Sequence, residues 1–265
     1  MKILKPVILV CALALTVIIS CKKDTVQNES KKQNDIPESI LSKIKSSGYS
    51  TDNVQRIGDG FLVENDILLK ESDMVGSQNK LAIAKEEQYR TSAVVCGLPR
   101  TLTVRVTGFS NPNFATGTQQ AIADYNALGL RLKFQYVTGS SADITISGQC
   151  LSGGILGYGG FPTGCNPYST IVLNSCSSYF STVCLIRKVV RHEIGHCIGF
   201  RHTDWMNRSY SCGSGGNEGT AGVGAIQIPG TPSAPDAGSW MLACANTACT
   251  GFNNNDIIAL RYLFQ

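Results

Sequence analysis

The stretch HEIGHCIGFRHTD, residues 192–204, constrains this chain most strongly because it holds all of the chain's histidines. Residues four apart share one face of a helix, so His192 and His196 can present two imidazoles to one metal ion. Gly199 can adopt the left-handed conformation that ends a helix, and the resulting turn lets His202 approach from outside it. Three imidazoles and one open position are typical of a catalytic zinc. We therefore predict a Zn²⁺ site formed by these three histidines.

Glu193 follows the first predicted ligand and points to the side of the histidine pair. From there its carboxylate can reach a metal-activated water without binding the metal, which is the place of a general base. A bare H-E-x-x-H also occurs by chance, with structural histidines as the alternative reading. The longer pattern, and the absence of any histidine elsewhere in the sequence, favour the metal site.

The full pattern H-E-x-x-H-x-x-G-x-x-H resembles the zinc-binding sequence of the metzincin peptidases. This resemblance implies a tight turn that carries a methionine beneath the metal. Met206 follows His202 too closely for the chain to loop round, whereas Met241 lies far enough along. The residues Ser239-Trp240-Met241, preceded by Asp236, look like that turn. We expect Met241 to pack under the histidines and not to bind the metal.

A closer resemblance comes from the motif together with IPGTP at 228–232 and D-x-x-S-x-M at 236–241. These segments resemble the bacterial dual-action HEIGH metallopeptidases, with similarity from about Gly58 to the C-terminus. The resemblance implies a zinc peptidase with the three histidines as ligands and Glu193 as catalytic base. No tyrosine follows Met241 closely, so a fifth protein ligand is not expected.

The first residues of the chain predict export. Lys2 and Lys5 precede a mostly apolar stretch that is short for a transmembrane helix, so 1–20 is interpreted as a lipoprotein signal peptide. The stretch ends in VIISC, which looks like a lipobox in which Cys21 is acylated and tethers the protein to a membrane. An ordinary secretory signal or an uncleaved anchor are the alternatives. Residues 21–37 are polar and predict a flexible tether.

These features predict an exported bacterial lipoprotein of the cell envelope, at the outer membrane or the cell surface, or released extracellularly. We expect a monomer whose partners are a protein or peptide substrate and, through Cys21, a membrane. The net charge is +4, and no basic run with interleaved aromatic residues is present, so nucleic-acid binding is not indicated.

Residues 38–92 form an N-terminal propeptide-like region. A short amphipathic helix is predicted over 39–47 and one or two strands over 56–69. A region of this size is marginal as an independent fold, so it either is a propeptide or packs permanently on the next domain. Such regions can keep a zinc peptidase latent through a side chain in the open metal position. The candidates are Cys96, Glu64, Asp66 and Asp73, each of which could equally be an ordinary surface or core residue.

Residues 93–265 are predicted to form one α+β domain. Strands are expected over 101–108, 131–137, 142–148 and 170–175, with an irregular glycine-rich edge strand within 153–164. Helices are expected from Thr116 or Thr118 to Leu128, from Tyr179 or Ser181 into the motif, and at the C-terminus behind an Asn254 or Asn255 cap. The order resembles metzincin catalytic domains: a twisted mixed sheet with an antiparallel edge strand, an active-site helix, a methionine turn and a C-terminal helix.

The same resemblance implies a role for the edge strand. An extended substrate would pair with it by strand addition and lie across the zinc. Gly157, Tyr158, Gly159 and Gly160 would then form the substrate-binding rim of the cleft. The alternative is a glycine-rich loop without substrate contact.

The cysteine count indicates disulfides. Of 11 cysteines, Cys11 leaves with the signal peptide and Cys21 takes lipid, and export favours pairing of the rest. The number of cysteines that remain is odd, so one thiol stays free, and we assign it to Cys96. The best candidates for pairing, in no deducible order, are Cys165, Cys176, Cys184, Cys212, Cys244 and Cys249.

Taken together, the sequence predicts an exported, lipid-anchored zinc endopeptidase with Glu193 as general base. Two other classes stay open: a non-catalytic surface lipoprotein that binds a protein or glycan, and a factor that processes only its own N-terminal region. The intact Glu193 argues against a pure binding role. Substrate preference does not follow from the sequence.

Overall fold

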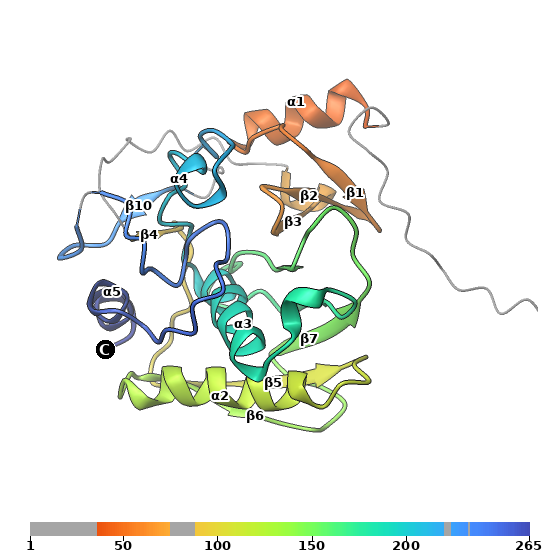
Figure 1. Ribbon diagram of the computed structural model, residues 1–265. Helices are drawn as coiled ribbons and strands as arrows, with labels where there is room; N and C mark the ends of the chain where they lie inside the picture. Colours follow the sequence, from red (N-terminus) through yellow and green to blue (C-terminus); the bar gives the residue numbers. More distant parts are fainter. Residues whose placement is uncertain (1–35, 75–87, 220–223, 233) are drawn as a thin grey trace, which may run out of the picture.

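The computed structural model describes residues 36–74, 88–219, 224–232 and 234–265 (Figure 1). The predicted signal peptide, Cys21 and almost all of the predicted tether lie outside the described residues. Within the described ranges, no helix combines the length and the apolar character that crossing a bilayer requires. The chain forms a small N-terminal lobe and a larger α+β body.

A five-stranded sheet carries the body, and its strands follow the order β6-β5-β7-β9-β8. Four strands run parallel: β5 (Arg100–Thr107), β6 (Leu132–Tyr136), β7 (Ile144–Gln149) and β9 (Thr170–Asn174). The edge strand β8 (Gly157–Tyr158) pairs antiparallel with β9 through the registers Gly157–Leu173 and Tyr158–Val172. This arrangement confirms the predicted α+β fold with a mixed sheet and an antiparallel edge strand.

Two helices pack on the sheet and on each other, namely α2 (Asn113–Ala127) and α3 (Val183–Ile198). Figure 1 shows α3 in the middle of the molecule, with α2 below it and the lobe above it. The helices approach closely at Gly117, where an added Cβ would lie 2.6 Å from Ile186. Helix α2 begins several residues earlier than predicted, after Pro112, because the segment Asn111–Asn113 already turns into it.

Helix α3 begins later than predicted. Ser177 caps a separate short 3-10 helix, η3 (Ser178–Phe180), and Thr182 then caps α3 by accepting a hydrogen bond from Leu185 N. Two successive caps therefore replace the single start that the sequence predicted at Tyr179 or Ser181.

The C-terminal helix α5 (Asn254–Phe264) starts behind Asn253, so the predicted cap at Asn254 or Asn255 is wrong. Asn253 and Asp256 form a capping box, and this pair sets the helix start. With this start Leu260 and Phe264 enter the core, whereas Ile258 is exposed.

The N-terminal lobe contains α1 (Glu38–Ser46) and an antiparallel sheet of β1 (Gln55–Ile57), β2 (Gly60–Val63) and β3 (Ile67–Lys70), followed by the 3-10 helix η2 (Glu71–Met74). Its apolar cluster includes Ile40, Ile44 and Phe61 from the lobe and also Phe161 from the body. The lobe therefore completes its core with a side chain of the domain it covers.

The segment after α3 is irregular. It contains a single helical turn, α4 (Ser209–Cys212), and β10 (Ile226–Gln227), which pairs with β4 (Tyr89–Arg90). The short pairing holds the start of the body against this segment.

Four disulfides join described residues: Cys96–Cys165, Cys150–Cys176, Cys184–Cys249 and Cys212–Cys244. All six cysteines predicted to pair do so. The assignment of the free thiol to Cys96 is wrong, since Cys96 pairs with Cys165 and the free thiol is the buried Cys197. Cys197 lies on the core side of α3, where no second sulfur comes near enough to bond.

Candidate metal centre

Helix α3 carries His192 and His196, and its end determines where His202 lies. Gly199 caps the helix at φ 119°, a left-handed conformation, and its N–H donates to the carbonyls of Gly195 and His196. A side chain at Gly199 would meet Val94 at 2.8 Å, so only glycine fits this turn. The chain then reverses and brings His202 back to the helix.

The three imidazoles converge through their Nε2 atoms. The Nε2 of His196 lies 3.0 Å from that of His192 and 3.2 Å from that of His202. Two nitrogens bound to one tetrahedral zinc at about 2.0–2.1 Å would lie roughly 3.3 Å apart. The observed spacing therefore fits three ligands of one zinc ion.

The opposite ring nitrogens are all held by the protein. Nδ1 of His192 donates to the carbonyl of Trp240 (3.0 Å), and Nδ1 of His196 donates to the carbonyl of Phe200 (2.9 Å). Nδ1 of His202 donates to the carboxylate of Glu218 (2.8 Å). With each proton placed on Nδ1, Nε2 is the ring atom left to bind a metal. Burial lowers the pKa of His202, but the charges of Asp66 and Glu218 outweigh it and raise this pKa well above its usual range, so the ring gives up its Nε2 proton when a metal binds. Burial also lowers the pKa of His196 to about 4, which keeps this ring neutral.

Glu193 lies beside this triad under the edge strand. Added Cβ atoms at Gly157 and Gly159 would come within 3.0 Å and 3.3 Å of its carboxylate oxygens. Burial, and then the charge of Asp66, raise the pKa of Glu193 well above its usual range. Its Oε2 is buried and accepts no hydrogen bond from the described residues.

Met241 lies under the helix between the first two histidines. An added Cβ at Gly195 would fall 2.4 Å from the Met241 sulfur and 3.0 Å from the indole nitrogen of Trp240. The glycine of the HEIGH sequence therefore leaves the space that the methionine fills. Met241 is fully buried, and its carbonyl accepts a hydrogen bond from Thr203 N at 2.9 Å.

Asp66, from the N-terminal lobe, adds a carboxylate to the three imidazoles. Its Oδ2 lies 2.5 Å from Nε2 of His202 and 3.7 Å from Nε2 of both His192 and His196. Burial alone would raise the pKa of Asp66, but the charge of His202 and the three imidazole contacts outweigh it and hold this pKa well below its usual range. The four residues could hold one metal ion.

Two of the other candidates for this position have different partners. Cys96 is disulfide-bonded, and Glu64 points to Arg201 at 3.5 Å. The side chain of Asp73 lies outside the described residues.

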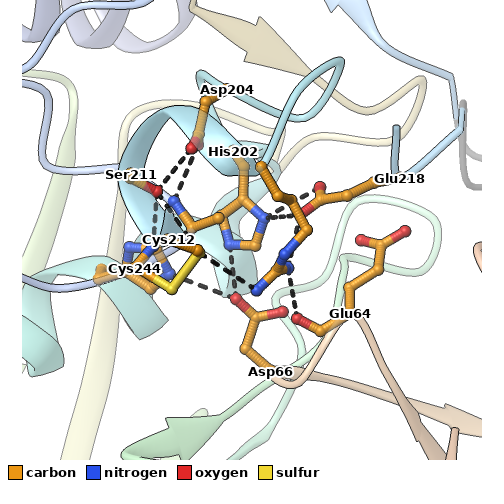
Figure 2. The surroundings of a disulfide bond; sticks show 11 residues. Glu64, Asp66, His202, Asp204, Ser211, Cys212, Glu218 and Cys244 are labelled. Carbon is orange, nitrogen blue, oxygen red and sulfur yellow. Dashed lines mark hydrogen bonds and ion pairs between the residues drawn. A yellow bond between two sulfur atoms is a disulfide. The ribbon is translucent and has the colours of Figure 1, made fainter. Parts of the chain in front are cut away.

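Glu218 is a site residue that the sequence did not predict. Figure 2 shows the His202 ring between Glu218 on one side and Asp66 on the other. Arg208 donates to Glu218 at 2.7 Å, and Arg201 lies 3.4 Å from it. Burial alone would raise the pKa of Glu218, but His202 and the two arginines lower it. No spacing rule connects a loop glutamate to the motif, so the sequence offered no signal for it.

Asp204 anchors the loop after His202 (Figure 2). Its carboxylate accepts hydrogen bonds from Ser211 Oγ (2.6 Å) and Ala243 N (2.9 Å). Ser211 Oγ in turn accepts from Cys244 N at 3.0 Å, next to the Cys212–Cys244 disulfide. Asp204 thus ties the motif to the segment after Met241, while Arg201 contacts Glu64 and Glu218.

A cavity of about 410 Å³ opens beside His192. His192 and Glu193 line it, together with Gly157 of the edge strand, Asp66 of the lobe and Leu242 after Met241. Of the predicted rim, only Gly157 borders this cavity. Within that rim, Gly159 pairs with lobe residue Ile67, Tyr158 is buried against lobe residue Leu62, and Gly160 faces the ring of Tyr168.

Comparison with known proteins identifies the family. Residues 62–264, well over half of the chain, match the model of the dual-action HEIGH metallopeptidases. The chain belongs to this family. It is therefore a metallopeptidase, and the family implies zinc as its metal, in agreement with the spacing of the three imidazoles.

Two solved structures of myroilysin resemble this metallopeptidase. One has a TM-score of 0.43 at 13% identity and covers 66% of this chain and 96% of its own. The other has a TM-score of 0.36 at 16% identity, with coverage of 62% and 80%. At these scores the likeness adds nothing to the family assignment. A search of the curated proteins gives no significant match.

Proposed function

We propose that this zinc endopeptidase uses Glu193 as its general base and His192, His196 and His202 as its metal ligands. The observation that carries the proposal is the set of Nδ1 hydrogen bonds to Trp240, Phe200 and Glu218. These bonds fix each imidazole in the form that a metal requires, and a merely structural histidine would not need this alignment.

A zinc ion held by His192, His196 and His202 would supply the Lewis acidity needed to activate a water and polarise the scissile carbonyl. Glu193 accepts the proton of the attacking water at its unpartnered Oε2 and delivers it to the leaving amine. Its raised pKa, caused by burial and then by Asp66, suits a group that must hold the proton between these two events. Met241 supports the imidazoles from below without taking part in the chemistry.

The substrate would bind in extended form along Gly157, Tyr158, Gly159 and Gly160. Support comes from Gly157 and Gly159, whose missing side chains bring backbone to within van der Waals reach of Glu193. A peptide paired with this edge would carry its scissile bond past the carboxylate.

The proposal includes an extracytoplasmic setting. Four disulfides suit an oxidising compartment. The apolar stretch of residues 1–20 and the lipobox-like sequence before Cys21 favour export and lipid anchoring, with 21–37 as tether. Residues 38–92 would then act as a propeptide-like region of the exported chain.

Peptide cleavage by variants with and without the Glu193 carboxylate tests the mechanism. Because Asp66 contacts all three imidazoles, the comparison is made between Asp66→Ala and the double variant Asp66→Ala/Glu193→Gln, with a mixed peptide library as substrate. Both proteins should bind one equivalent of zinc, and the double variant should cleave about 10²–10⁴-fold more slowly. Chelator should abolish cleavage by Asp66→Ala.

Equal cleavage by the two zinc-loaded variants would refute Glu193 as the base. Zinc binding without cleavage of any peptide would refute the endopeptidase function. Cleavage confined to the chain's own N-terminal region would indicate a self-processing factor instead.

A further inference from the structure

We infer that the N-terminal lobe, residues 36–74, is this peptidase's own inhibitor and that Asp66 closes the fourth position of its metal site. The inference rests on the proposed function, because it concerns the regulation of the same centre. Three sets of contacts carry it: a side chain at the metal position, a backbone pairing on the substrate edge, and a buried charge network.

The side chain of Asp66 takes the place that a catalytic zinc leaves open. Its Oδ2 lies 2.5 Å from Nε2 of His202, within the same group of converging ligand atoms. A carboxylate oxygen is an ordinary zinc ligand, and three imidazoles with one carboxylate complete a tetrahedral set. A closed set of four protein ligands is typical of structural zinc, which has no position for water.

The backbone around Asp66 takes the place of a substrate. Gly159 N donates to the carbonyl of Asp66, and Leu68 N donates to the carbonyl of Gly159, both at 2.9 Å. Ile67 and Gly159 thereby form a parallel bridge on the outer side of β8. The edge groups that a peptide substrate would use are therefore already paired within the chain.

A buried charge network secures the same segment from the other side. Arg208 donates to the backbone carbonyl of Glu64 at 2.6 Å, and Arg201 lies 3.5 Å from the Glu64 carboxylate. Both arginines also contact Glu218, which holds His202. The lobe thus shares these two arginines with Glu218, the residue that accepts a hydrogen bond from His202.

Apolar packing shows that the lobe is built to rest on the body. Phe161 belongs to the lobe's cluster, and its ring contacts the imidazole of His196 at 5.6 Å between centroids. Leu62 packs in a second cluster with Tyr158 and Val172 of the edge strands. The lobe covers the rim itself, not a distant surface.

In this arrangement, metal binding and docking of the lobe depend on each other. If Asp66 binds zinc, zinc stabilises the docked lobe, and undocking the lobe opens the zinc to an external ligand. Peptidase activity then requires displacement or removal of residues 36–74. A lobe docked only by packing would show neither link.

Binding of acetohydroxamate to the zinc-loaded full chain tests the first direction. The proteins compared are the wild type, Asp66→Ala and Asp66→Asn, with Asp59→Asn as matched control, because Asp59 lies exposed in the turn between β1 and β2 of the same lobe. Both Asp66 variants should bind the hydroxamate about 5- to 150-fold more tightly than the wild type, and the control should not. Cobalt substitution should give an absorption spectrum that differs from the wild type only in the Asp66 variants.

Limited trypsin digestion tests the second direction and does not depend on activity. Chelation should speed cleavage within residues 36–74 of the wild type, but should change nothing in Asp66→Asn, whose lobe has lost its link to the metal. Asp66→Asn keeps the shape of the side chain, so it addresses the question even where Asp66→Ala folds poorly.

The outcomes separate this inference from the proposed function. Equal hydroxamate binding and equal spectra in wild type and Asp66 variants would overturn the inhibitor role, whether or not peptides are cleaved. Tighter hydroxamate binding by the variants, without any peptide cleavage, would support the closed metal site and refute the peptidase function instead.

Discussion

Glu218 accepts a hydrogen bond from Nδ1 of His202 at 2.8 Å, although 16 residues separate the two in the sequence. The contact is fully buried, and Arg208 lies 2.7 Å from the same carboxylate. The third imidazole is therefore oriented by a loop residue, while the first two are oriented by backbone carbonyls. This difference makes Glu218 the one Nδ1 partner of the three imidazoles that a side-chain substitution can remove.

Glu218→Ala should weaken zinc binding about 10- to 100-fold, because an unoriented imidazole loses both alignment and basicity. Competition with a chromophoric chelator measures the loss. Glu71→Gln, which changes an exposed carboxylate of the lobe, is the control and should bind zinc as the wild type does. Unaltered zinc affinity in Glu218→Ala would show that His202 does not need this partner.

Gly195→Ala should destabilise the fold by about 1–3 kcal/mol through overpacking. In an ordinary helix interior the same change stabilises by roughly 1 kcal/mol, so the sign is diagnostic. The reason is the Met241 sulfur, which lies 2.4 Å from the position of the new Cβ. Urea unfolding measures the change. In a Met241→Ala background the penalty should largely disappear, and a penalty that persists there would mean that Met241 is not its cause.

Asp256 should make stability depend on pH. Burial raises its pKa to about 7, although Gln88 and the backbone of Trp240 and Asn253 donate to it. A group with a raised folded-state pKa stabilises fully below its unfolded pKa of 3.8 and loses that contribution as pH rises to about 7. The total is on the order of 4 kcal/mol, from about three pKa units.

The measurement is the free energy of unfolding of wild type and Asp256→Asn between pH 5.5 and 8. The advantage of the wild type over the variant should shrink as pH rises and level off above neutrality. Asp59→Asn, exposed in the lobe, should run parallel to the wild type. An advantage that grows with pH would mean that the hydrogen bonds to Asp256 outweigh its burial.

Alkylation should find one protected thiol among the described cysteines. Burial raises the pKa of the Cys197 thiol, and the side chain is fully enclosed in the core. Iodoacetamide should therefore label no described cysteine in the native protein and Cys197 alone after unfolding without reductant, as read by peptide mass mapping. Label on Cys96 would contradict the Cys96–Cys165 disulfide.

The zinc motif and the order of elements followed from the sequence because both are local patterns. The spacing of His192 and His196, the glycine turn and the alternation along the strands depend on residues close in the chain. Helix boundaries were predicted less accurately where several neighbouring residues could each serve as the N-cap. Three consecutive asparagines, 253–255, lie at the start of α5, and the partner Asp256, three residues beyond Asn253, decides which of them is the cap.

The remainder of the centre depends on contacts between distant segments. Glu218 comes from an irregular loop, and Asp66 reaches the histidines only because β3 pairs with the edge at Gly159. Asp66 was one of four candidates for the open position, and no local feature distinguishes it from Glu64 two residues earlier. Disulfide partners likewise depend on how loops meet in space. The sequence therefore predicted six cysteines that form disulfides, but not the partner of each one.

The Cys212–Cys244 disulfide joins the loop after the third ligand to the segment after the methionine turn, beside the Asp204 anchor. This cross-link can exist only where thiols are oxidised. A newly made chain in a reducing compartment therefore lacks one of the ties that hold the floor of the metal centre to its third ligand. Completion of the metal centre is in this way coupled to the oxidation of two thiols that lie far apart in the sequence.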